Sequence, residues 1–167
     1  MIRIDRHTTN EEVAPFVELF NEEQRKAIKD AAVRDKFGEA GFYGLTVGQL
    51  TSVLSGDSRP LFDSGGRTVF DMARVTAFSE WLDEFIVTLG RLTLPPTAEG
   101  MTLQSGTLKS TFEESVYTFC RSYFNLASFE ACDRLKVSEL LLAKKDDYNR
   151  AVVDRNVSRA IRKGGRA

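Results

Sequence analysis

Histidine and cysteine are scarce in this chain of 167 residues, which narrows the chemistry it can carry. His7 is the one histidine, and it stands in the N-terminal segment with no cysteine or carboxylate cluster around it. A structural zinc site needs about four closely spaced ligands, so the sequence predicts no metal site built on His and Cys. Cys120 and Cys132 are too few for a disulfide framework, and we expect both to be buried thiols of a protein in a reducing compartment.

An excess of charge of one sign is also lacking. The chain has 23 Lys and Arg residues against 24 Asp and Glu residues, a formal net charge of −1. The field of the whole molecule therefore favours neither nucleic acid nor a membrane surface, and such binding would need a local patch. No run approaches about 18 apolar residues, and the start "MIRIDRHTTNEE" has no apolar signal segment. We therefore expect a cytosolic protein, or one made in a cytosol, without a membrane span.

Familiar catalytic and nucleotide-binding patterns are missing too. The sequence contains no P-loop, no dinucleotide-binding glycine fingerprint and no EF-hand loop. The stretch "DSGG" at residues 63–66 matches part of the nucleophile segment of chymotrypsin-like serine proteases, but Phe62 and Arg67 flank it and no β-barrel is expected around it. The sequence therefore predicts a protein that is not an enzyme and holds no cofactor. An enzyme that gathers dispersed carboxylates, arginines or tyrosines in a deep polar pocket stays open as an alternative.

Helical periodicity is what the chain does have. The strongest pattern runs from about Thr68 to Arg91, where large apolar side chains recur at three- and four-residue steps. The last predicted helix runs from about Val137 to Gly164, with an apolar side assigned to Leu141, Tyr148, Val152 and Ile161. Further helices are predicted to follow Thr9, Asn21, Thr46, Ser110 and Ser128, three of them with capping boxes at Thr9 and Glu12, Thr46 and Gln49, and Ser110 and Glu113.

These patterns predict an all-α fold, an irregular bundle of five to seven helices around a central long helix, with a short extended N-terminal arm. We expect residues 1–40 to hold the arm and amphipathic helices. Residues 41–167 are expected to form the helical core domain with a basic C-terminal helix end. The two parts are predicted to make one compact unit.

One short stretch occurs twice: "LTVGQL" at residues 45–50 returns as "LKVSEL" at residues 135–140. In the first copy, Thr46 is placed to cap a helix. The second copy has Lys136 at that position, and an ammonium group cannot accept an amide hydrogen bond. We therefore expect Ser138 or Asp133 to cap instead and to shift the helix start. We interpret the echo as one way of starting a helix used twice, with a degenerate duplication as the alternative.

A glycine-rich loop precedes the long helix and is a candidate anion site. Two glycines before a helix expose backbone amides, and arginines stand nearby. The alternative is a turn that simply ends in a helix cap. The candidate residues are Arg59, Gly65, Gly66 and Arg67.

The C-terminal segment carries a local excess of positive charge. Three interpretations stay open: basic residues complementing the helix macrodipole, docking on an acidic protein surface, and binding of nucleic acid. Nucleic acid is favoured less than protein, because the last twenty residues contain only one aromatic residue, Tyr148. The candidate docking residues are Arg155, Arg159, Arg162, Lys163 and Arg166.

From about Phe42 onward, the order of segments resembles small helical proteins of tailed bacteriophages, particularly those related to crAss-like phages. The similar pieces, which span roughly two thirds of the chain, are "FYGLTVGQLTSVLSGD", "FSEWLDEFIVTLGRLTLPPT", "TFEESVYTFCRSYFNLASF" and "LKVSELLLAKKDDYNR". The resemblance implies a virion component or a head- or tail-assembly factor, found in the bacterial host cytoplasm or in the virion. Its partners would be other proteins of a larger assembly, copies of itself included. The resemblance carries over no functional residues.

Overall fold

The computed structural model describes residues 4–95 and 111–164, and in that part of the chain it confirms the all-α prediction. Seven α-helices and three 3-10 helices follow one another there, with no strand among them. In chain order they are α1 (Asn10–Val13), η1 (Ala14–Leu19), α2 (Glu22–Phe37), η2 (Gly38–Gly44), α3 (Val47–Leu54), η3 (Arg59–Leu61), α4 (Val69–Arg91), α6 (Phe112–Phe124), α7 (Phe129–Asp133) and α8 (Val137–Gly164).

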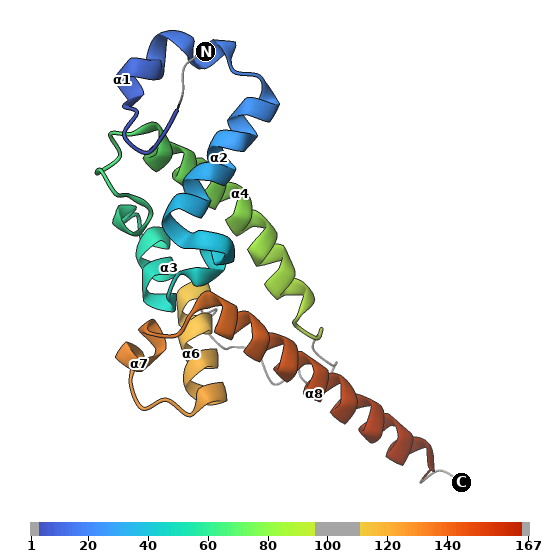
Figure 1. Cartoon of the computed structure of the whole chain (residues 1–167). Helices are drawn as coiled ribbons and strands as arrows, with labels where there is room; N and C mark the ends of the chain where they lie inside the picture. Colours follow the sequence, from blue (N-terminus) through green and yellow to red (C-terminus); the bar gives the residue numbers. More distant parts are fainter. Residues whose placement is uncertain (1–3, 96–110, 165–167) are drawn as a thin grey trace.

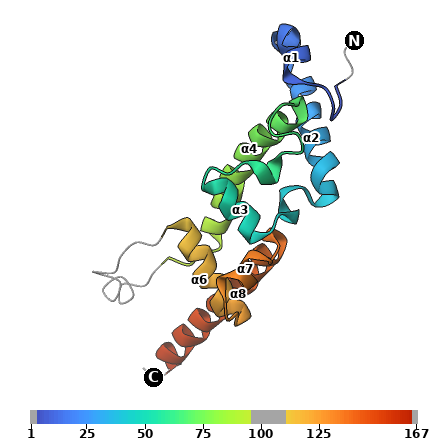
Figure 2. The same ribbon diagram turned by 90° about the vertical axis from the view of Figure 1, so that its left-hand side faces the viewer.

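The molecule is elongated, with α1 near one end and the last turns of α8 at the other (Figure 1). Figure 2 shows the same separation of the two ends from a second direction. Helix α2 packs along α4, where Ala32 is buried and Lys29 forms a 2.7 Å ion pair with Glu80. Most other side chains of α2 are exposed.

Phenylalanine and other large rings fill the core, which lies where α2, η2, α3 and α4 meet α6 to α8. Phe42 packs edge-on against Phe78, with ring centroids 5.4 Å apart. Trp81 stacks on Phe85 at 4.8 Å, and Phe85 is almost fully buried. Offset and edge-on ring pairs of this kind contribute about 0.5–1.5 kcal/mol beyond the area that they bury. The abundant phenylalanine of the sequence is therefore used largely inside the protein.

The two copies of the echoed stretch lie side by side. Their backbones form an antiparallel bridge, in which the amide of Val47 donates to Leu135 over 2.7 Å and the amide of Val137 donates to Leu45 over 2.8 Å. Each copy thus starts a helix, as interpreted, and each also holds the other in place. The expected shift of the second helix start is wrong: α8 begins at Val137, directly after Lys136.

Lys136 takes the position that Thr46 takes in the first copy, with half of the capping interactions. The carboxylate of Glu139 reaches back to accept the amide of Lys136 over 2.7 Å. The amide of Glu139 donates to the Lys136 carbonyl, since no side-chain oxygen is available there. The bridge to α3 fixes where α8 begins, so a side-chain cap is not needed to define the start.

A second antiparallel bridge joins the starts of α1 and α4 in the same way. The amide of Asn10 donates to the Arg67 carbonyl over 3.0 Å, and the amide of Val69 donates to Thr8 over 2.9 Å. The described part of the predicted arm, residues 4–8, therefore contains a turn and runs into this bridge. The start of α1 is thus joined to that of α4, and the start of α3 to that of α8, although each pair is far apart in the sequence.

One predicted capping box is displaced by a single residue. Helix α6 is capped by Thr111, whose hydroxyl accepts the amide of Glu114, and the Glu114 carboxylate accepts the amide of Thr111. The predicted pair was Ser110 and Glu113. Both pairs satisfy the same sequence rule, and Ser110 itself lies outside the described residues. The Thr111 register places Val116 and Cys120 in the core.

Candidate interaction surface

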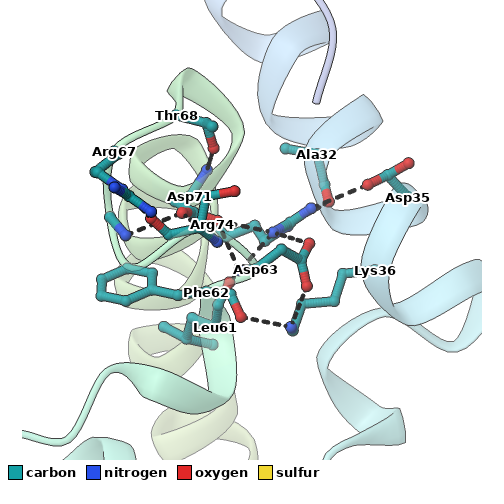
Figure 3. A network of polar contacts seen from close by, with 12 residues as sticks. Ala32, Asp35, Lys36, Leu61, Phe62, Asp63, Arg67, Thr68, Asp71 and Arg74 are labelled. Carbon is teal, nitrogen blue, oxygen red and sulfur yellow. Dashed lines mark hydrogen bonds and ion pairs between the residues drawn. The ribbon is translucent and has the colours of Figure 1, made fainter. Parts of the chain in front are cut away.

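The glycine loop before α4 does bind a carboxylate, but the carboxylate belongs to the chain itself (Figure 3). Asp71, fully buried in the first turn of α4, accepts three backbone N–H groups. They come from Asp63, Ser64 and Gly66, over 2.9, 3.0 and 2.9 Å. Gly65 and Gly66 adopt positive φ angles, which lets the loop curl over Asp71. These amides of the predicted anion loop are engaged internally, and an external anion there stays a prediction.

The two arginines of that prediction point to different partners. Arg59 forms a 2.7 Å ion pair with Asp57, and it lines a polar cleft of about 910 Å³. Arg67 folds back on its own loop, where its Nε donates to the Ser64 carbonyl over 3.1 Å. Neither Arg67 nor the two glycines line the cleft that Arg59 lines. The structure therefore does not bring Arg59 and Arg67 together at one site.

Arg74 is the centre of the polar network, and it is fully buried. Its Nη1 lies 2.6 Å from Asp63 and 3.2 Å from Asp71, and its Nη2 lies 3.1 Å from Asp35. The guanidinium also donates to two backbone carbonyls, Ala32 at 2.7 Å and Leu61 at 3.4 Å. We call these four charged residues the Arg74 node: Arg74, Asp35, Asp63 and Asp71. The node ties α2 and the glycine loop to α4.

Lys36 extends the node to the protein surface. Its ammonium group lies 2.7 Å from Asp63 and donates to the Phe62 carbonyl over 2.8 Å. Burial acts to raise the pKa of Asp63, but the hydrogen bonds and charges of Lys36 and Arg74 outweigh it and hold that pKa below its ordinary value of 3.8. The positive charges at the node are thus matched by carboxylates, so the node acts as a structural clamp.

Sequence reasoning did not single out Asp71 or Arg74. One signal was available, because Phe70, Arg74 and Phe78 follow one another at four-residue steps and so share a helix face. An arginine between two core phenylalanines must find acceptors when that face is buried. Apart from Asp71 in the same helix, the acceptors come from residues 32, 35, 61 and 63, which no local pattern connects to α4.

The first half of α8 is held against α6. Lys144 lies over the ring of Phe119, 3.7 Å from its centroid, and burial lowers the pKa of Lys144. Tyr123 of α6 donates a hydrogen bond to Asp146, and Arg150 lies over the Tyr123 ring at 5.9 Å. These contacts, together with the buried apolar residues of its first turns, anchor α8 up to about residue 152.

The second half of α8 extends beyond the other described elements (Figures 1 and 2). We call residues 153–164 the projecting end. Of the predicted docking residues, Arg155 is half-buried and donates to the Pro95 carbonyl over 2.6 Å. Arg159, Arg162 and Lys163 are exposed on the projecting end. Arg166 lies outside the described residues.

An apolar stripe runs along the projecting end, and the sequence analysis did not identify it. Val153, Val157 and Ile161 stand at four-residue steps and are 58%, 51% and 69% exposed. The assignment of Ile161 to the same side as Val152 was wrong. Nine residues at about 100° each place the two half a turn apart, and only Val152 is partly buried.

The two cysteines are buried thiols, as predicted. Burial and the neighbouring Cys132 raise the pKa of Cys120 to about 11, against a smaller opposite effect of Lys144. Burial also raises the pKa of Cys132. A thiol with a raised pKa is a poor nucleophile at neutral pH, so both cysteines serve as core residues.

Within residues 4–95 and 111–164, no group of three or more His, Cys, Asp or Glu side chains is arranged to hold a metal ion. None of the helices described there combines the length and the apolarity that a membrane crossing requires. No protein-family model, curated protein or solved structure matches this chain. The projecting end carries both the exposed apolar stripe and the exposed basic residues.

Proposed function

We propose that this chain is a non-enzymatic structural or assembly protein that acts through protein–protein contacts made by the projecting end of α8. The observation that carries the proposal is the stripe of Val153, Val157 and Ile161 in solvent. Covering such a side chain is favourable by about 1.5–3 kcal/mol when burial is complete. Burial of all three side chains by one partner surface would therefore contribute several kcal/mol to the binding free energy, roughly three times the value for one.

The form of this surface fits a known mode of recognition. Apolar residues at positions i, i+4 and i+8 of a helix suit an apolar groove on a partner. Arg159, Arg162 and Lys163 lie on the opposite face of the same turns and favour a partner of negative charge, which raises the association rate and the selectivity. A helix that already exists in the free protein has less ordering entropy to lose on binding.

The setting that we propose is a tailed-bacteriophage particle, with the protein in the bacterial host cytoplasm during assembly or in the virion. Its support is the resemblance of the segments from Phe42 onward, which reach into the first half of α8. The partners would be other proteins of the particle and copies of the chain itself.

A nucleic-acid-binding accessory role is the second candidate. The exposed Arg159, Arg162 and Lys163 on one short stretch of helix favour it. Binding of this kind depends on neutralising phosphates and weakens steeply with salt. It does not require Val157 or Ile161, so the two roles respond differently to substitutions on the two faces of the projecting end.

Affinity capture from the native context tests the proposal. The tagged full chain is compared with a stripe variant, Val157→Glu with Ile161→Glu. A control variant, Ile86→Glu with Val87→Glu, places the same charges on apolar residues of α4 that are 45% and 52% exposed. We expect defined protein partners with the full chain and the control, and their loss with the stripe variant.

Two results would count against this role. Nucleic acid captured in a way that depends on Arg159 and Arg162, but not on the stripe, would favour the second candidate. Equal protein capture by all variants, and by a chain lacking residues 155–167, would remove the projecting end from the function.

A further inference from the structure

We propose that the polar cleft lined by Arg59 binds a small molecule that carries several phosphate groups. The cleft has a volume of about 910 Å³, within the range of pockets that hold small-molecule ligands. Its walls come from segments far apart in the chain, among them residues 6–7, α2, η3 and the residue before α8. The site is separate from the projecting end, so the inference does not depend on the proposed function.

Two of the basic residues that line the cleft are positioned by the antiparallel bridges between helix starts. Lys136 is itself part of the bridge between α3 and α8. Arg6 lies in the turn that leads into the bridge between α1 and α4, where the amide of Thr8 donates to the Asp5 carbonyl over 3.1 Å. The backbone at both cations is therefore fixed before a ligand arrives, which reduces the ordering entropy lost on binding.

These two cations are available to an incoming anion. Among residues 4–95 and 111–164, no carboxylate forms an ion pair with Arg6 or Lys136. The Nε of Arg6 donates to the Nε2 of His7 over 3.2 Å, and the Glu139 carboxylate accepts the backbone amide of Lys136 over 2.7 Å. Both cationic side chains are exposed. An anion in the cleft would supply the counter-charge that they lack in the described part of the chain.

Two carboxylates also line the cleft, and both are engaged by the Arg74 node. Asp35 lies 3.1 Å from Arg74. Figure 3 shows Asp63 between Arg74 and Lys36, at 2.6 and 2.7 Å. Arg74 does not line the cleft, so it offsets the charge of these two acids from behind the wall. The acids of the wall are therefore held in place and matched by positive charge.

Positive charge exceeds negative charge at the cleft. The lining holds four Lys and Arg side chains against two Asp side chains. With the buried Arg74 and Asp71 behind the wall and the Asp57 that pairs with Arg59, the set has five positive and four negative members. Asp71 is also compensated by three backbone amides. Because two separate cations lack an ion pair, a ligand with several negative groups gains more than a ligand with one.

Phosphate oxygens suit the donors of this cleft. The guanidinium groups of Arg6 and Arg59 can bind a phosphate through two parallel hydrogen bonds, and a lysine ammonium binds it as a point charge. The Arg59 side chain is 88% exposed, so it can exchange Asp57 for a ligand. Gln49 and Ser64, which also line the cleft, add an amide and a hydroxyl group as uncharged donors.

Calorimetric titration of the purified full chain with inorganic triphosphate tests the site. The variant Arg6→Gln with Lys136→Gln removes the two cations that lack an ion pair. The control, Arg159→Gln with Arg162→Gln, removes the same charge from the projecting end. We expect the cleft variant to bind triphosphate at least about tenfold more weakly, and the control to bind it like the unchanged chain.

Amide chemical shifts recorded during the same titration locate the ligand. We expect the largest changes at Gln49 and Ser64, which line the cleft and are not substituted. ATP and adenosine are two further arms. ATP that binds more tightly than triphosphate would show that the cleft also contacts the nucleoside, and equal affinities would show recognition of the phosphates alone. Adenosine that binds as tightly as ATP would overturn the inference.

Three other outcomes would also overturn it. The first is an unchanged chain that does not bind triphosphate up to about 1 mM. The second is a loss of binding in the control but not in the cleft variant, which would move the site to the projecting end. The third is an equal loss in both, which would indicate general attraction to a charged surface. None of them affects the proposed function, whose test uses Val157 and Ile161.

Discussion

The two long helices of this protein begin alike and end differently. Helices α4, of 23 residues, and α8, of 28 residues, both start at an antiparallel bridge to another helix start. Helix α4 then buries Asp71 and Arg74 completely. Helix α8 leaves the core and carries Ile161 into solvent.

The comparison shows that surroundings, not residue type, decide burial here. A buried arginine is tolerated when its donors find acceptors, and the Arg74 guanidinium has three carboxylates and two carbonyls around it. Ile161, by contrast, is 69% exposed on the projecting end. The buried arginine with its acceptors stabilises the fold, and the exposed isoleucine leaves apolar surface in contact with water.

The largest effect is expected from Arg74→Met, which removes the centre of the clamp. Asp71 would stay buried without its counter-charge, and the Ala32 and Leu61 carbonyls would lose a donor. We expect a loss of about 3–5 kcal/mol in the free energy of unfolding, measured by urea titration. Arg67→Met on the exposed side of the same loop is the control, with a change within about 0.5 kcal/mol. Equal losses of stability in Arg74→Met and Arg67→Met would show that the Arg74 node does not hold α2 and the glycine loop to α4.

Gly48→Ala should disturb the frame that holds the start of α8. A Cβ at Gly48 would lie 2.9 Å from the Cβ of Asp133, and Asp133 is held by a hydrogen bond from Tyr117. We expect a loss of about 1–3 kcal/mol in chemical denaturation. Gly90→Ala, with open space around it in α4, should instead be neutral or stabilising.

Lys136→Thr should make the start of α8 more like that of α4. A threonine there can accept the amide of Glu139, as Thr68 accepts the amide of Asp71 over 3.3 Å. We expect a gain of about 1 kcal/mol, seen as a higher urea midpoint. Thr46→Ala, which removes the matching cap from α3, should lose a similar amount. No gain from Lys136→Thr would mean that the bridge alone determines the helix start.

Acid should weaken the clamp from its exposed edge. Because the pKa of Asp63 is lowered on folding, its contribution is present above the ordinary value of 3.8 and is lost as the pH falls through the lower folded value. Thermal melting between about pH 5 and pH 2 should therefore show a smaller acid-induced decrease in Asp63→Asn than in the unchanged chain. An unchanged pH profile would rule out this contribution.

The smallest effect is expected at the projecting end. Ile161→Ala should change the free energy of unfolding by less than about 0.5 kcal/mol, because the side chain is 69% exposed. Circular dichroism melting at low protein concentration measures this without association. A loss comparable to that of a core residue would show that the stripe is covered within one chain.

Much of the fold was predictable because its signals are local. The helix over residues 69–91, the caps at Thr9, Asn21, Thr46 and Ser128, and the late helix to Gly164 all follow from spacing and capping rules. The α6 cap was missed by one residue, since Ser110 and Thr111 each precede an acid by three positions. The face of Ile161 was also assigned wrongly. Over the nine residues from Val152 the helix turns by a net half turn, so the two side chains lie on opposite faces.

The candidate site was predictable only in part. The basic residues of the projecting end can be seen in the sequence. Their position beyond the other described elements depends on where the contacts between α6 and α8 end. The sequence predicted a candidate anion site at the glycine loop. It did not predict that the anion bound there is the carboxylate of Asp71, because an acidic residue within a helix is usually solvated.

The sequence by itself determined which segments are helical, where most of them begin, and that the C-terminal segment is basic. Those properties depend on neighbours within about four residues, or on composition alone. Only the tertiary structure decided that the echoed stretches pair, that Arg74 is buried among three aspartates, and that Val153, Val157 and Ile161 stay uncovered. Each of these depends on residues far apart in the chain, whose meeting is fixed by packing and not by any local pattern.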